Sequence, residues 1–301
     1  MPAIGTDVSV GVGAEHRFAM AACKTLSVHI YPNRNFTAGA PAWAHDSDED
    51  SECVTIDLSS TEFIDTLGLV AIAAVAEDAV TQGRAVDLRL PTLLRTRNWL
   101  ARMHLGQSLQ ELDIPCNLDS VVESALGDRL LELHRFDSTS PDELAEKVYA
   151  ILASDNAEEA GELFRSVAEA AANVWEHSGA SGGWAALRQK GQGPDRGVEF
   201  AVGDCGVGLR ASLSKAIPVA SDVAAIEHAV QKGVSGTGER NRGLGLAEIA
   251  ASAQRRDGSL RLFSGRAGGF TLPNGKILAR NSLARYPGTL VYATLKFETG
   301  R

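Results

Sequence analysis

The segment Glu169-Ala-Ala-Ala-Asn173-Val-Trp-Glu-His177 ends a stretch with helical periodicity that begins near Ala157. At about 100° per residue, its apolar residues fall on one side of the helix and its polar residues on the other. Glu169, Asn173 and His177 are four residues apart and line up along one edge. Taken alone, the segment is best interpreted as the solvated face of an amphipathic helix. The apolar side carries Leu163, Val167, Ala171, Val174 and Trp175, and the polar side carries Glu162, Arg165, Ser166, Glu169, Asn173 and His177.

A second motif, Asp204-Cys-Gly206-Val-Gly208, directly follows a strand-like run at 198–203. A carboxylate at a strand end can accept a hydrogen bond from the amino group of adenine. Gly206 and Gly208 allow the chain to turn sharply and to pass close to a flat ligand. Because Asp and Gly are common in ordinary turns, this motif is a weak signal by itself.

Two further glycine motifs follow. Gly243-Leu244-Gly245-Leu opens an apolar helix, whose N-terminal N–H groups suit phosphate oxygens. The glycine-rich residues 232–242 before it predict a mobile lid, with an ordinary flexible loop as the alternative. Gly288-Thr289 starts the final strand, where the threonine hydroxyl could support an adenine site directly or through water.

In this order, the four motifs resemble those of the GHKL ATP-binding family, which includes histidine kinases, gyrase-type ATPases and anti-sigma-factor serine kinases. The resemblance covers about residues 140–298 and implies a Bergerat-type pocket that binds ATP and Mg²⁺. It implies that Asn173 supplies a side-chain oxygen to Mg²⁺, that Asp204 reads adenine, and that Gly243 and Gly245 cradle phosphates. The nucleotide-binding residues that it implies are Asn173, His177, Asp204, Gly206, Gly208, Gly243, Leu244, Gly245 and Thr289.

Glu169 is the candidate catalytic residue. A carboxylate one helical turn before the magnesium ligand can orient or deprotonate a water or a protein hydroxyl. The resemblance implies the same role, because a glutamate occupies this position in the ATPase and anti-sigma-kinase branches. A structural glutamate that forms a salt bridge is the alternative. No histidine outside the pocket lies in a His-Glu motif on a long coiled-coil helix, which argues against conventional histidine kinase activity.

The N-terminal half has a different pattern. Residues 54–69 read Val-Thr-Ile-Asp-Leu-Ser-Ser-Thr-Glu-Phe-Ile-Asp-Thr-Leu-Gly-Leu and lead into an Ala-rich helical stretch. With the strand-like run after Gly83, they resemble a STAS domain of the anti-sigma-factor-antagonist type. The resemblance implies that Thr66, directly after Asp65, is a phosphoacceptor, although Leu67 stands where the family usually has a second hydroxyl residue. The alternative is that Asp65 or Thr66 caps the helix.

The chain is therefore expected to be α/β, with a small STAS-like α/β domain followed by a two-layer α/β sandwich of the GHKL type. We expect an unassigned segment at 1–24, the STAS-like domain at 25–118, a connecting segment at 119–140 and the ATP-binding domain at 141–301. The leading hypothesis is a serine/threonine kinase that phosphorylates a STAS domain, its own or a partner's, as a regulatory switch. The alternatives are an ATPase clamp that hydrolyses ATP to drive conformational change and a non-catalytic ATP-sensing interaction protein. The expected protein partner is a STAS-domain or sigma-factor-like regulatory protein. The sequence leaves open whether the domains act within one chain or across a homodimer.

Composition limits the classes of partner. The chain has 29 Lys and Arg against 38 Asp and Glu, a net charge of −9, which disfavours general nucleic-acid binding but not a local basic patch. Its longest apolar run, 69–76, is far below the ~20 residues that cross a bilayer. The four cysteines, Cys23, Cys53, Cys116 and Cys205, are scattered, as in a cytoplasmic protein with reduced thiols.

Overall fold

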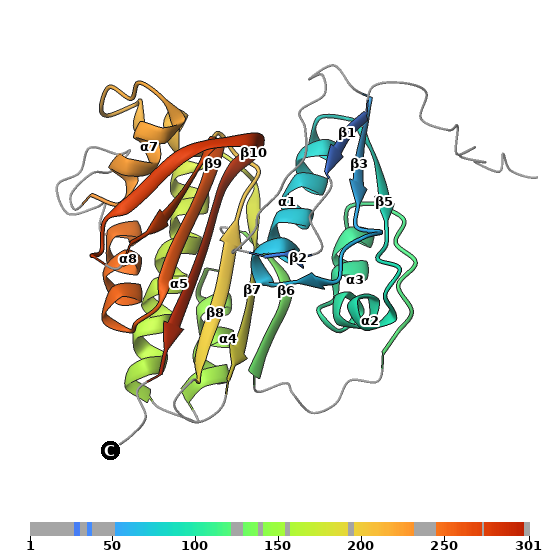
Figure 1. Ribbon diagram of the computed structural model, residues 1–301, viewed down its shortest axis with the longest axis horizontal. Helices are drawn as coiled ribbons and strands as arrows, with labels where there is room; N and C mark the ends of the chain where they lie inside the picture. Colours follow the sequence, from blue (N-terminus) through green and yellow to red (C-terminus); the bar gives the residue numbers. More distant parts are fainter. Residues whose placement is uncertain are drawn as a thin grey trace, which may run out of the picture.

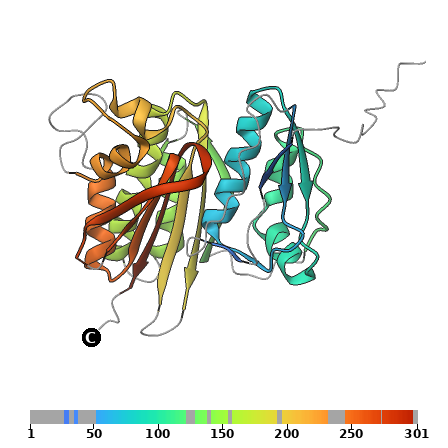
Figure 2. The same cartoon turned by 45° about the horizontal axis from the view of Figure 1, so that its top comes forward.

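Two sheets lie on either side of one long helix in the computed structural model (Figures 1 and 2). The fold is α/β, as the sequence predicted. In the part of the chain that the structure describes, no helix is both long and apolar enough to cross a membrane. The described residues are 27–30, 35–37, 52–121, 129–137, 141–153, 157–191, 196–231, 245–272 and 274–297, so the predicted segment 1–24 lies outside them.

The C-terminal half is built on a five-stranded sheet in which all neighbouring strands are antiparallel. Alternation along β7 sends Ala185 and Leu187 into one core, and Trp184 and Ala186 into another on the opposite face. Helices α4, α5 and α8 cover the first of these faces (Figure 1). The strands, in sheet order, are β6 (Leu130–Asp137), β7 (Gly182–Lys190), β8 (Gly197–Gly203), β10 (Ile277–Lys296) and β9 (Ser259–Thr271). The helices are α4 (Pro141–Ala153), α5 (Ala157–His177), α6 (Gly208–Leu213), α7 (Asp222–Ala229) and α8 (Gly245–Arg255).

The N-terminal half contains a parallel three-stranded sheet in the order β1-β3-β5. A short parallel pair, β2 and β4, lies beside it. The elements are β1 (Ser27–Ile30), β2 (Asn35–Phe36), β3 (Cys53–Asp57), β4 (Phe63–Ile64), α1 (Thr66–Thr81), β5 (Ala85–Arg89), α2 (Leu94–Arg102) and α3 (Leu105–Gln110).

Helix α1 is buried on both sides, between the two sheets. It packs against β3, β5 and α3 on one side and against β7, β8 and β10 on the other. Thirteen of its sixteen residues are buried, because nearly every position up to Ala76 is apolar. One hydrophobic core therefore joins the two halves, and the sheet contributes Trp184, Ala186, Ala201, Phe263, Tyr286, Leu290 and Tyr292 to it.

A buried ionic contact fixes α1 to the sheet near the C-terminal end of the helix. Glu77 accepts hydrogen bonds from the indole Nε1 of Trp184, at 2.6 Å, and from Nη2 of Arg135, at 2.8 Å. Arg135 also donates to the hydroxyl of Ser181, at 2.9 Å. Both oxygens of this buried carboxylate are therefore paired with donors from β6 and β7.

The structure differs from the sequence prediction at two places. The connecting segment predicted at 119–140 contains β6, Leu130–Asp137, which pairs with β7 as the first strand of the large sheet. Its side chains at Leu131, Leu133 and Phe136 are buried, so the sheet recruits this segment through apolar contacts. The last strand, expected to start near Gly288, starts at Ile277 instead and continues through irregular pairing around Tyr286.

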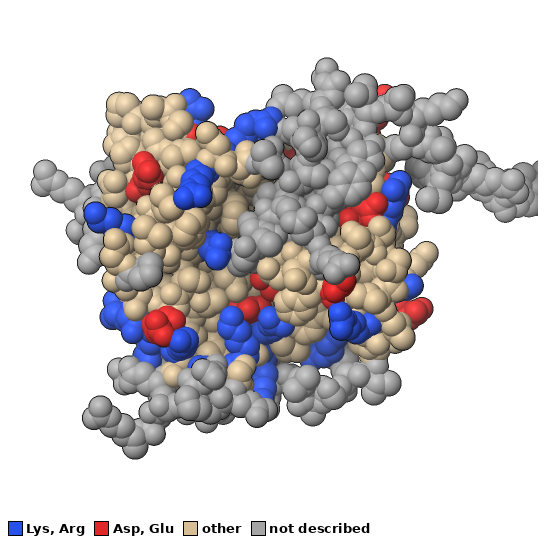
Figure 3. All heavy atoms as spheres, viewed as in Figure 1, with Lys and Arg blue, Asp and Glu red and all other residues tan. Residues whose placement is uncertain are grey.

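Charge is unevenly distributed over the surface. On the face shown in Figure 3, Lys and Arg side chains gather along the lower edge, with Asp and Glu interspersed among them. The net charge of −9 thus coexists with a local concentration of basic side chains.

Candidate functional site

Helices α5 and α8 bring together three of the residues that the sequence singled out. A Cβ atom added to Gly245, the first residue of α8, would lie 2.9 Å from Oε2 of Glu169 and 3.1 Å from Nδ2 of Asn173. Only glycine therefore allows this close approach without displacing a neighbour. The Glu169 carboxylate lies at the N-terminal end of α8, where the helix dipole favours negative charge.

The side chain of Asn173 is oriented by its own helix. Its Nδ2 donates to the backbone oxygen of Glu169 at 2.8 Å. With the amide nitrogen engaged in this way, Oδ1 is the atom turned away from that carbonyl. Mg²⁺ prefers oxygen ligands and usually retains several waters or phosphate oxygens around it. The orientation of Asn173 therefore suits a role as one oxygen ligand of this ion.

Asp204 lies at the end of β8 and is almost fully buried, with 3% of its surface exposed. Its Oδ1 accepts a hydrogen bond from the N–H of Gly206 at 2.7 Å, and the N–H of Thr289 also donates to the carboxyl group. The N–H of Asp204 in turn donates to the backbone oxygen of Thr289 at 3.0 Å. Thr289 thus reaches Asp204 through its backbone.

Burial determines the protonation behaviour of Asp204. It raises the pKa of this carboxyl group to about 7, although the two backbone N–H donors favour the ionised form. Acidic groups with such a raised pKa are concentrated at functional sites.

The glycines around Asp204 are required by close packing. A Cβ atom at Gly206 would lie 2.2 Å from the backbone oxygen of Ser178, just after α5, and that oxygen accepts from the N–H of Val207. Gly208 has a φ of +77° and lies against the Ser264 hydroxyl. The loop after β8 is therefore tied to the end of α5, one turn beyond Val174, and both groups of predicted residues belong to one region.

Some predicted site residues lie outside the described part of the chain. Gly243 and Leu244 are among them, as is the lid predicted at 232–242. His177 ends α5, but its side chain is not described.

Thr66 is in a different environment from these residues. It is fully buried at the start of α1, and its hydroxyl has no hydrogen-bond partner among the described residues. Asp65 caps the helix by accepting from the N–H of Gly68 at 3.0 Å, which confirms the capping alternative for that residue. Since α1 and α5 cover opposite faces of the large sheet, Thr66 and Glu169 lie on opposite sides of it.

Charged side chains line a cavity of about 360 Å³ near the start of α1. Within it, Glu199 pairs with Arg188 at 2.8 Å and with Lys190 at 3.3 Å, and it accepts from the Tyr292 hydroxyl at 3.1 Å. These charged groups pair with one another, so we interpret the residues that line the cavity as a polar contact between the two halves.

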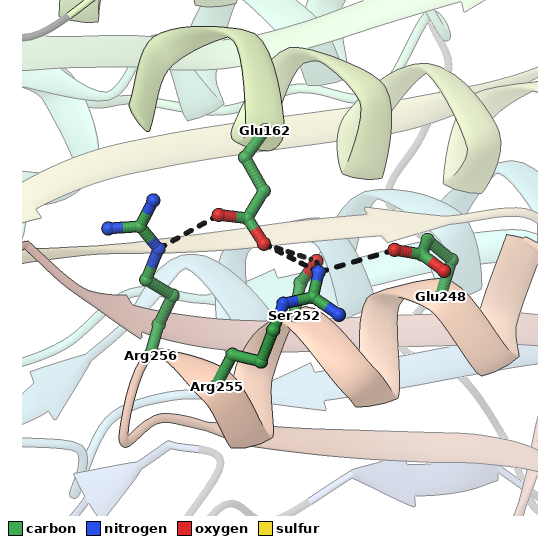
Figure 4. Close-up of polar contacts among 5 residues, drawn as sticks. All are labelled: Glu162, Glu248, Ser252, Arg255 and Arg256. Atoms are coloured by element: carbon green, nitrogen blue, oxygen red, sulfur yellow. Dashed lines mark hydrogen bonds and ion pairs between the residues drawn. The ribbon is translucent and has the colours of Figure 1, made fainter. Parts of the chain in front are cut away.

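A further polar cluster was missed by the sequence analysis. Glu162, placed on the polar side of α5, accepts hydrogen bonds from Ser252 and Arg255 on α8 and from Arg256, which directly follows α8 (Figure 4). The helical wheel predicted that Glu162 lies on the polar side of α5. Its partners are about 90 residues away in the sequence, and nothing in the local pattern indicates them.

Comparison of the sequence with protein-family models and with curated proteins finds no match. The GHKL and STAS resemblances therefore remain predictions, and they depend on the motifs themselves.

The spacing at Gly245 gives a first test of the site. We expect Gly245→Ala to weaken ATP binding at least tenfold, because the added Cβ would displace Glu169 or Asn173. The folded state should lose little stability, since alanine favours the helix by up to ~1 kcal/mol over glycine. Titration with ATP and thermal melting would measure the two effects.

Gly161→Ala is the matched control, because a Cβ there would meet only Arg165 Nη1 at an ordinary 3.8 Å. It makes the same chemical change in α5 and should leave ATP affinity unchanged. Equal affinities of wild type and Gly245→Ala would show that this contact is not part of a nucleotide site.

Proposed function

We propose that the protein binds Mg-ATP between α5, α8 and the loop after β8. The observation that carries this proposal is the convergence of Glu169, Asn173 and Gly245, with the buried Asp204 tied to the end of the same helix α5. Asn173 would contribute Oδ1 to the metal ion, which would supply charge compensation for the phosphates. Asp204 would accept a hydrogen bond from the adenine amino group, which distinguishes adenine from guanine.

The reaction that we propose is transfer of the terminal phosphate to a serine or threonine hydroxyl of a STAS domain. Glu169 would orient the hydroxyl and accept its proton, since its carboxylate lies beside Asn173 at the N-terminal end of α8. The burial of Thr66 on the other face of the sheet favours an acceptor on a partner protein. The protein would then be a regulatory switch of the cytoplasm, where its described cysteines, Cys53, Cys116 and Cys205, are free thiols.

Hydrolysis by an ATPase clamp is the second candidate. The observation that favours it is the same burial of Thr66, because this predicted acceptor lies on the other face of the sheet from Glu169 and water can act as the nucleophile in its place. A nucleotide sensor without catalysis would use the same binding residues and leave ATP intact.

The test is incubation of the purified chain with Mg²⁺ and γ-labelled ATP, with and without a separately purified STAS-domain protein. We expect label on the added STAS protein, and Glu169→Gln should abolish this transfer while ATP affinity stays within about twofold. Free phosphate with no labelled protein would identify an ATPase. Label on Thr66 would show that α1 leaves the sheet. Absence of ATP binding by the wild type would overturn the proposal.

A further inference from the structure

Glu162 connects the two helices that carry the proposed nucleotide residues. Its Oε1 accepts from the Ser252 hydroxyl at 2.8 Å and from Nη2 of Arg255 at 2.7 Å, while Oε2 accepts from Nε of Arg256 at 2.8 Å. One carboxylate on α5 thus holds three donors at the C-terminal end of α8, two in its last turn and one directly after it, as Figure 4 shows. Charge-assisted hydrogen bonds of this kind are shorter and stronger than neutral ones.

The cluster and the nucleotide residues lie on the same helix–helix contact, two turns apart. Glu162 and Glu169 are seven positions apart on α5, and Gly245 and Ser252 are seven positions apart on α8. Because Gly245 contacts Glu169 while Ser252 contacts Glu162, the two helices run antiparallel with matched spacing. Two helical turns span about 10 Å, so a rigid segment of each helix joins the two contacts.

The surroundings of Glu162 favour a fixed contact over an interchangeable surface pair. Its side chain is 14% exposed, and that of Arg256 is 13% exposed. Hydrogen bonds from the two arginines and the serine overcome the effect of burial and lower the pKa of Glu162 to about 2, so it stays ionised near neutral pH. Glu248, in contrast, contacts Arg255 from within α8 and is half exposed.

We propose that Glu162 is a positioning residue for the nucleotide site. By fixing α8 along α5, it sets the distance between Gly245 and the side chains of Glu169 and Asn173. Phosphate and metal would bind beside these residues. The inference rests on the proposed function, since it assigns Glu162 an effect on ATP affinity. Glu162 itself does not touch the nucleotide.

The test compares ATP dissociation constants of folded variants at one temperature. Glu162→Gln should raise the dissociation constant about tenfold, since it removes the charge that holds three donors. Ser252→Ala, which removes one of these donors, should raise it by a smaller factor. Glu248→Gln is the control, because it removes a carboxylate that contacts Arg255 without linking the helices, and it should change affinity less than twofold.

A double variant separates positioning from a general loss of stability. In the Gly245→Ala background, where the gap is already altered, Glu162→Gln should change affinity less than threefold. Full additivity of the two substitutions, or unchanged affinity of Glu162→Gln in a wild type that binds ATP, would overturn the positioning role alone. A wild type that does not bind ATP would overturn the proposed function, and this inference with it.

Discussion

Replacing Glu77 by alanine is expected to destabilise the protein by about 2–3 kcal/mol. The substitution leaves the indole N–H of the fully buried Trp184 without an acceptor and leaves Arg135 without the carboxylate that it contacts. Leaving a buried hydrogen-bond donor unpaired costs ~1–3 kcal/mol, and more when the lost partner was charged. Arg135 is 31% exposed, so water can take the place of the carboxylate there. Urea denaturation, followed by tryptophan fluorescence and circular dichroism, would measure the loss.

A matched substitution separates this contact from the general effect of removing a glutamate from a helix. Glu248→Ala removes a half-exposed glutamate of α8, whose pair with Arg255 should contribute less than about 1 kcal/mol. Glu77→Gln, which keeps hydrogen-bond acceptor capacity without the charge, should lie between the two. Equal midpoints for Glu77→Ala and wild type would show that this carboxylate does not hold α1 on the sheet.

Asp204→Asn is expected to separate stability from binding. The asparagine keeps one oxygen for the N–H of Gly206 but replaces the other with an amide donor. In the proposed site this donor would face the adenine amino group and leave both groups without acceptors, so we expect ATP affinity to fall at least a hundredfold. The same change removes a buried charge, which should stabilise the protein without nucleotide at pH values above 7.

The raised pKa of Asp204 determines how the stability difference between wild type and Asp204→Asn changes with pH. Because burial raises the pKa of Asp204 to about 7 in the folded protein, folding takes up a proton between the unfolded pKa and that value. The contribution of Asp204 to stability is therefore fully present at low pH and is lost as pH rises through about 7. The stability of Asp204→Asn relative to wild type should rise on the order of 3–4 kcal/mol from pH 4 to pH 8.

Denaturation of both proteins at several pH values would measure this difference, with ATP titration on the same samples. A constant difference across this pH range would show that Asp204 titrates normally and is not desolvated. Unchanged ATP affinity in Asp204→Asn would remove the residue from adenine recognition.

The sequence predicted local elements well where periodicity and breakers agree. Helix α5 has the predicted bounds, because its polar and apolar sides alternate regularly. Strand β10 was predicted too short, since Pro287 and Gly288 indicate a break. The strand tolerates them through shifted pairing and a φ of +71° at Gly288.

The relation between the halves could have been anticipated from α1. A helix that is apolar on all sides must be covered on all sides, and a three-stranded sheet covers only one of them. The site was only partly accessible to sequence reasoning. The motifs identified Asn173, Asp204 and Gly245, but the link through Glu162 joins residues about 90 positions apart and emerges only when α5 and α8 pack together.

The shared position of α1 also determines how such a chain can diverge. A modular signalling protein can exchange its sensory half because each half keeps its own interior. Here a replacement N-terminal half would have to contain a helix that packs against Trp184, Tyr286 and the other side chains of the large sheet that now contact α1. The two halves should therefore evolve as one unit. Substitutions in α1 should co-vary with substitutions on the face of the large sheet that contacts it.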